Sequence, residues 1–87
     1  MEQAVIKNFF NHSGKCFGFL YGKNGEVFFH INDHAMIIGY GVNAEFGSKV
    51  RTERIPRNND TVIYEEVYDH KDRLKARRWC FVDEMPV

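Results

Sequence analysis

The sequence predicts an all-β protein, built as a small barrel of five strands. Three observations indicate this fold class. β-Branched and aromatic residues recur in short runs, few windows keep a helical period, and turn-forming residues separate the runs. The chain has only 87 residues. We therefore expect residues 1–87 to form a single domain around one small core.

Each of the five strands is bounded by turn residues. The Asn-Gly pair at residues 24–25 is a strong signal for a hairpin between the second and third strands. Residues 32–58 are less regular, with a β-like run at 36–42, and predict either a long loop or an inserted hairpin. Five strands with an irregular stretch after the third fit a small barrel. The expected strands are 4–10, 15–21, 26–31, 61–68 and 73–82.

Aromatic residues lie on both sides of the second and third strands. Strand alternation gives one face to Leu20, Val27, Phe29 and Ile31, which form a credible core face. The opposite face then exposes several rings. Gly18, between two outward rings, is expected to leave space for a base to lie flat. The outward residues of the hairpin are Phe17, Phe19, Phe28 and His30.

An exposed aromatic sheet face is typical of proteins that bind single-stranded nucleic acid. Bases stack on the rings, and cations around the rings contact the phosphates. The other interpretation is that part of this chain, such as residues 32–58, covers the patch.

Several motifs resemble the cold-shock domain family. Residues 15–20, KCFGFL, are similar to its K-G-F-G-F-I motif, and residues 27–31, VFFHI, to its V-F-V-H-F motif. Residues 60–65 resemble a later strand of that family, and Lys75-Ala76-Arg77 falls where its last strand should lie. The resemblance covers most of the chain. It implies a five-stranded oligonucleotide-binding (OB) barrel that binds single-stranded RNA or DNA with low sequence specificity.

The resemblance also implies which residues contact nucleic acid. The family's first strand carries K-W-F-N, and either Asn8 or Phe9 takes the place of its tryptophan; we favour Phe9. The sequence departs from the family at Cys16, which replaces glycine, at Ile31, which replaces an aromatic residue, and in the longer 32–58 segment. Trp79 is expected in the core. The expected contacts are Lys7, Phe9, Lys15, Phe17, Phe19, Phe28, His30, Lys75 and Arg77.

The charge distribution leaves a second function class open. The formal net charge is zero, with basic runs at residues 49–57 and 71–78 and an acidic run at 60–69. Neutrality lowers the affinity expected from phosphate contacts. The alternative is therefore an OB-fold module that binds another protein through the aromatic face or the 32–58 segment.

Other classes find little support. The scattered His and Cys residues lack zinc-ligand spacing, and no nucleophile or phosphate-binding motif is present. We expect neither an enzyme nor a metal site, and no cofactor. Residues 1–10 carry an acid and no long apolar run, so we expect no signal peptide, and no apolar run in the sequence is long enough to cross a membrane. Cys16 and Cys80 are expected to be reduced in a cytoplasmic protein.

Overall fold

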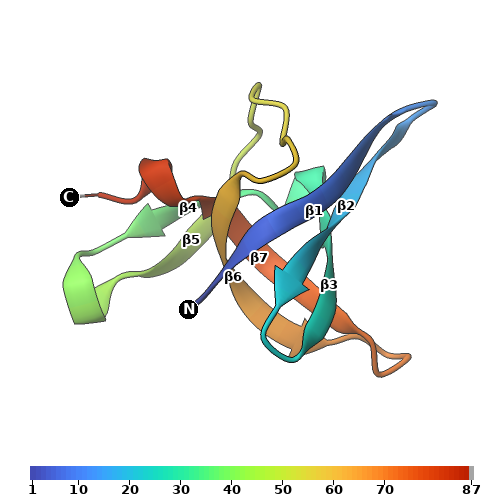
Figure 1. The fold of residues 1–87 in the computed structure, drawn as a ribbon. Coiled ribbons are helices and arrows are strands. Elements are labelled where there is room, and N and C mark those ends of the chain that lie inside the picture. Colours follow the sequence, from blue (N-terminus) through green and yellow to red (C-terminus); the bar gives the residue numbers. More distant parts are fainter. Residues whose placement is uncertain (87) are drawn as a thin grey trace.

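The computed structural model describes residues 1–86 and confirms the all-β fold class. Five strands close a barrel in the order β1-β2-β3-β7-β6 (Figure 1). Neighbouring strands are antiparallel except β3 and β7, which are parallel, and β1 closes the barrel against β6. This is the arrangement of an OB-type barrel. The strands are β1 (Glu2–His12), β2 (Lys15–Gly22), β3 (Gly25–His30), β6 (Thr61–Tyr68) and β7 (Leu74–Phe81).

The segment between β3 and β6 contains the inserted hairpin, one of the two expected alternatives. Strands β4 (Ala35–Ile38) and β5 (Glu45–Lys49) pair as a separate two-stranded sheet. Three short 3-10 helices complete the fold: η1 (Ile31–Asp33), η2 (Gly41–Asn43) and η3 (Val82–Glu84). None of the helices in the described part of the chain is long and apolar enough to cross a membrane.

The β1–β2 hairpin is longer than predicted and projects beyond the barrel (Figure 1). Asn11 and His12, expected in a turn, pair with Cys16 and Lys15 instead. The turn is only Ser13-Gly14, where φ is 54° and 76°. Two consecutive residues with positive φ match the twist of a tight two-residue hairpin, and this allows pairing to continue to the tip.

The core lies on the barrel face that alternation predicted. Leu20, Val27, Phe29 and Trp79 are fully buried, and Ile31 is half-buried against them. The Trp79 indole Nε1 donates a hydrogen bond to the His30 carbonyl, with a distance of 2.8 Å. This satisfies the one polar group of the buried tryptophan and fixes the end of β3 to β7.

A β-bulge in β1 changes which side chains face outward. Ile6 lies opposite Leu20, and the next pair is Asn8 with Phe19, so Lys7 is the extra residue. A bulge moves every later residue of the strand to the other face. Phe9 therefore points inward, where its ring stacks on Phe29 with centroids 5.8 Å apart. Phe9, expected to contact nucleic acid in place of the family's tryptophan, therefore does not lie among the outward rings.

Gly18 serves the core and not the outer surface. A Cβ atom at Gly18 would lie 2.2 Å from the Asn8 carbonyl oxygen and 2.8 Å from the Phe29 ring. The glycine therefore leaves room inside the barrel for Phe29 and for the backbone of β1. This corrects the expectation that its missing side chain accommodates a base outside.

Replacing Gly18 by alanine should destabilise the fold by about 1–3 kcal/mol, because the backbone of β1 must move. Urea denaturation of Gly18→Ala measures the loss. Gly47→Ala is the matched control, since its added methyl group meets flexible side chains of Met36 and Ile38 at 3.2 and 3.3 Å. Equal stability of the Gly18 variant and wild type would show that β1 is not held this closely.

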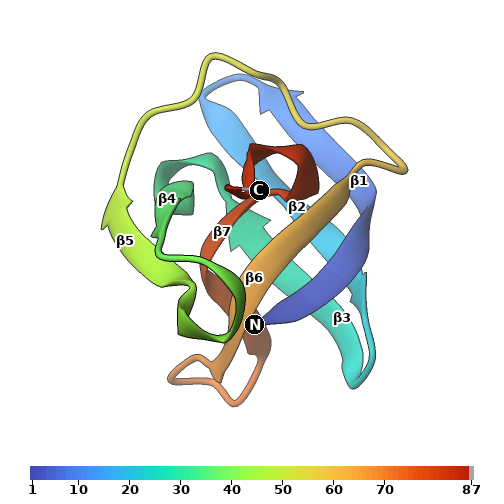
Figure 2. The same ribbon diagram turned by 90° about the vertical axis from the view of Figure 1, so that its left-hand side faces the viewer.

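The inserted hairpin packs on the outside of β6 and β7, as seen beside these strands in Figure 2. A second cluster of buried side chains forms there from Ala35, Phe46, Ile63 and Cys80. Arg78 reinforces the contact by donating hydrogen bonds to the carbonyls of Phe46 and Gly47 at 3.2 and 3.1 Å. The hairpin is thus part of the folded unit.

The connection from β5 to β6, residues 50–60, arches over one end of the barrel (Figure 2). Buried His34 holds its start, with Nδ1 3.0 Å from the Val50 carbonyl and Nε2 2.8 Å from Glu84. Further along, Arg54 pairs with Asp83 at 2.7 Å and lies over the Phe81 ring. These contacts attach the connection to the carboxyl-terminal turn.

Candidate nucleic-acid interface

Five rings lie together on the outer side of β1, β2 and β3. The cross-strand pairs place Phe10 opposite Phe17, Phe17 opposite His30, and Phe19 opposite Phe28. Directly paired residues of antiparallel strands share a face, so the rings form one continuous surface. We call it the ring face: Phe10, Phe17, Phe19, Phe28 and His30.

Phe17 is at the centre of the ring face. Its centroid lies 5.4 Å from Phe10, 6.1 Å from Phe19 and 5.5 Å from Phe28. The pairs are tilted or edge-to-face, so part of each ring plane is directed away from its neighbours. Such planes are suited to stacking with flat heterocycles.

The ring face remains accessible in the folded chain. Phe10 is 37% exposed, and the other four rings are half-buried against one another and the sheet. The inserted hairpin packs on β6 and β7, and residues 49–56 face Phe9, Cys16 and Ile31, so neither part lies against the ring face. The interpretation that residues 32–58 fold over the patch therefore does not apply to this structure.

His30 is held in a fixed orientation at the end of the ring face. Its Nδ1 accepts a hydrogen bond from the Asn32 backbone N–H at 3.0 Å. An oriented imidazole offers both a stacking plane and a polar edge. The sequence identified this ring correctly as outward, together with those of Phe17, Phe19 and Phe28.

The cations expected around the rings divide into two that form ion pairs with acidic side chains and two that do not. Lys7 pairs with Glu26 at 2.6 Å, which raises the pKa of the ammonium group, and Arg77 pairs with Glu65 at 3.0 Å. Within residues 1–86, Lys15 and Lys75 make no ion pair. Lys75 lies directly beside Phe28 in the β3–β7 pair. Lys15, two residues before Phe17, is on the same side of the strand.

Acidic side chains neutralise much of the two basic runs. Burial alone raises the pKa of Glu65, but hydrogen bonds from Arg78 and Arg77 outweigh it and hold that pKa below its usual range. Backbone and side-chain hydrogen bonds from Arg73 likewise lower the pKa of Asp69. The neutral net charge thus coexists with a locally basic border at Lys15 and Lys75.

Sequence reasoning missed Phe10. Because of the bulge, Phe10 and not Phe9 lies on the outer side of β1, opposite Phe17. Of the two candidates for the tryptophan position of the cold-shock motif, Asn8 lies on the outer side, opposite Phe19. A bulge has no clear signal in these residues. The inward stacking of Phe9 on Phe29 is the structural reason for the change.

The two cysteines lie in different environments and are unpaired. Cys16 is half-buried, and its Sγ is 3.6 Å from Asn11 Oδ1. Cys80 is only 1% exposed, and burial raises the pKa of its thiol to about 12. Among the described residues, no group of three or more His, Cys, Asp or Glu side chains is arranged to hold a metal ion.

We expect iodoacetamide to modify Cys16 and not Cys80 in the folded protein near pH ~8, because alkylation requires an accessible thiolate. Mass spectrometry after a timed reaction identifies the modified residue. Unfolding in urea should make both thiols reactive. Rapid alkylation of Cys80 without denaturant would contradict its placement beneath the inserted hairpin.

Comparisons with protein-family models, with curated proteins and with solved structures gave no match for this chain. The fold and the ring face together define the class of the protein, an OB-type barrel with an accessible aromatic surface. A functional interpretation therefore depends on the chemistry of that surface.

Proposed function

We propose that the protein binds single-stranded RNA or DNA by stacking bases on the ring face. The observation that carries this proposal is the continuous cluster of rings on the outer side of β1–β3. Soluble proteins rarely expose such a surface without a ligand or partner for it. Every base has a flat π-face, so stacking predicts binding with low sequence specificity.

Two further features support the proposal. Four of the five rings lie on β2 and β3 of the barrel, the strands that OB folds use for oligonucleotides. The border of the ring face carries Lys15 and Lys75, which are available for phosphates. The resemblance of residues 15–20 and 27–31 to cold-shock motifs agrees with this assignment, and the two unpaired cysteines agree with the proposed cytoplasmic location.

The salt dependence of binding should distinguish the available cations from the paired ones. Lys15→Ala and Lys75→Ala should each make the negative slope of log K against log salt shallower by about one, for one lost phosphate contact. Fluorescence anisotropy with a labelled oligonucleotide at several salt concentrations measures this slope.

Lys7→Ala and Arg77→Ala are the matched controls, with the same change in charge. Because Glu26 and Glu65 already pair with these cations, their removal should change the slope less. An unchanged slope for both Lys15→Ala and Lys75→Ala would show that phosphates do not bind along this border.

A second candidate function is the binding of a protein partner. Apolar side chains on β4 and the turn after it are exposed on the inserted hairpin, away from the ring face: Met36, Ile38, Tyr40 and Val42. Ile31, which replaces an aromatic residue of the cold-shock motif, and the neutral net charge also favour this alternative. Salt-dependent binding of a short single strand would favour the nucleic-acid function over it.

A further inference from the structure

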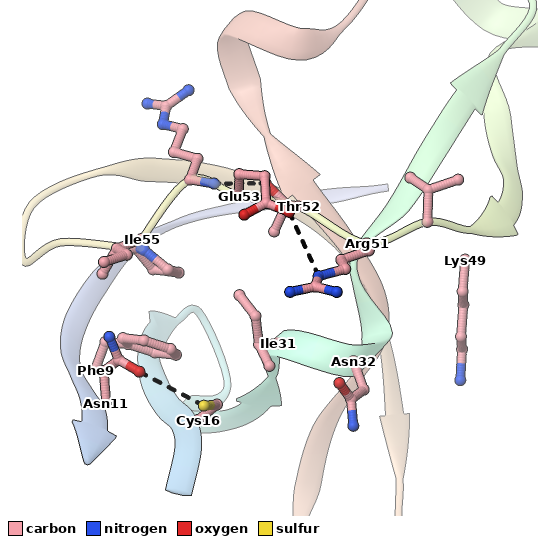
Figure 3. Close-up of a pocket in the computed structure, with 13 residues that line it drawn as sticks. Phe9, Asn11, Cys16, Ile31, Asn32, Lys49, Arg51, Thr52, Glu53 and Ile55 are labelled. Carbon is pink, nitrogen blue, oxygen red and sulfur yellow. Dashed lines mark hydrogen bonds and ion pairs between the residues drawn. The ribbon is translucent and has the colours of Figure 1, made fainter. Parts of the chain in front are cut away.

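A cleft of about 760 Å³ lies between the barrel and the connection that arches over it. Phe9, Cys16 and Ile31 form part of the barrel wall, and residues 49–56 form the opposite wall. Figure 3 shows the side chains of Phe9, Ile31 and Ile55 around this space, with Arg51 on the wall formed by the connection. The cleft belongs to the inserted segment as much as to the barrel.

The cleft combines an apolar floor with polar edges. Phe9 and Ile31 are half-buried and supply flat and aliphatic surface. Asn11 and Asn32 provide amide groups that can donate and accept hydrogen bonds at the margin. A planar heterocycle with polar edges matches this combination better than an aliphatic ligand does.

The charges on the connection favour an anionic ligand. Residues 49–56 carry three bases and one acid. Lys49 and Arg54 are held in ion pairs with Asp33 and Asp83 at the two ends of the wall. The side chain of Arg51 is 88% exposed, and its pair with Glu53 is long, at 3.5 Å. An exposed pair of this kind contributes little, so Arg51 is available for a phosphate.

Two residues of the cleft wall are chain neighbours of residues at one end of the ring face. Cys16 directly precedes Phe17 in β2, and Ile31 directly follows His30 at the end of β3. Alternation in β2 directs Cys16 away from the ring face, and Ile31, the first residue of η1, lines the cleft with it. A strand bound to the ring face therefore has to pass the end of β3 to enter the cleft.

We propose that the cleft holds one unstacked nucleotide of a strand that is bound to the ring face. Its base lies on Phe9 and Ile31 beneath Ile55, and its phosphate contacts Arg51. This inference rests on the proposed function, and it assigns to the inserted segment the role of holding the end of the bound strand.

Cys16 reports on the cleft directly, because it is the accessible one of the two thiols. A long single strand of about 12 nucleotides should protect Cys16 from iodoacetamide, while one of about four nucleotides should occupy only the rings and leave Cys16 reactive. The experiment uses both RNA and DNA strands with the full chain. Protection should be at least several-fold in the alkylation rate.

Two pairs of variants separate the cleft from the rings. Ile55→Glu places a negative charge at the cleft and should remove the protection, whereas Val42→Glu, at a residue 101% exposed on the distant hairpin, should not. Arg51→Ala should make the slope of log K against log salt for the long strand shallower by about one. Arg57→Ala should leave this slope unchanged, because Arg57 lies outside the cleft.

The outcomes distinguish this inference from the proposed function. Protection by the long strand alone, lost in Ile55→Glu, would support it. If both strands bind through Phe17 and Cys16 reacts equally with and without them, the cleft assignment is overturned and the ring-face function stands. If neither strand binds the wild-type protein, both are overturned.

Discussion

Replacing Phe17 by alanine should weaken the binding of a single-stranded oligonucleotide by about 1–3 kcal/mol and leave the barrel folded. Phe17 contacts Phe10, Phe19 and Phe28 at the centre of the ring face. Its loss removes one stacking plane and also the support of its neighbours. Phe19→Ala and Phe28→Ala should have effects in the same range.

Fluorescence anisotropy with a labelled oligonucleotide measures this change, and a thermal melt establishes that each variant is folded. Tyr21→Ala is the matched control. Tyr21 is also an outward aromatic residue of β2, but it is 63% exposed, pairs with Glu26 across the hairpin and lies under Lys7, and it is not among the ring pairs of the cluster. Wild-type affinity in the folded variants at Phe17, Phe19 and Phe28 would contradict stacking on this surface.

Replacing Phe29 by alanine should lower the free energy of unfolding by about 3–5 kcal/mol. Phe29 is fully buried, and its ring centroid lies 5.8 Å from Phe9 and 5.1 Å from Trp79. The small core cannot collapse into the space left by a missing ring without moving β1 or β7.

Urea denaturation measures the loss in Phe29→Ala, with Phe28→Ala as the comparison at the adjacent residue. Phe28 is half-buried on the outer side of the same strand, so its loss should cost less stability and more affinity. Unfolding curves of Phe29→Ala and wild type that coincide would overturn the assignment of the two faces of β3.

Much of this architecture follows from local patterns in the sequence. Alternation along β2 and β3 separates Leu20, Val27 and Phe29 from the outward rings, because one face of each strand must be buried. The bounds of β6 match the expected 61–68, where turn residues mark both ends. At these positions the alternation of side chains and the turn residues are enough to predict the structure, without knowledge of long-range contacts.

The features that sequence reasoning missed depend on long-range packing. The bulge at Lys7 turns Phe9 inward because its ring fits beside Phe29 in the space that Gly18 leaves. Likewise, the sequence does not show that Glu65 will pair with Arg77. These contacts join residues that are far apart in the chain, and no local pattern encodes them.

The existence of the cleft could not be predicted from the sequence either. The bases of residues 49–57 suggested phosphate contacts, but only the path of the connection over the barrel brings Arg51 to the same space as Phe9 and Ile31. That path depends on two anchors, at His34 and at Arg54. Both anchors depend on tertiary contacts with the carboxyl-terminal turn.

The most direct test of the central claim is an anisotropy titration with a labelled single strand and with the duplex of the same sequence, each at low and at high salt. Stacking on the ring face predicts binding of the single strand and much weaker binding of the duplex, whose bases are already stacked. Part of the single-strand affinity should persist at high salt, because salt screens phosphate contacts more than stacking. No single-strand binding at low salt, or equal binding of the duplex, would contradict the account.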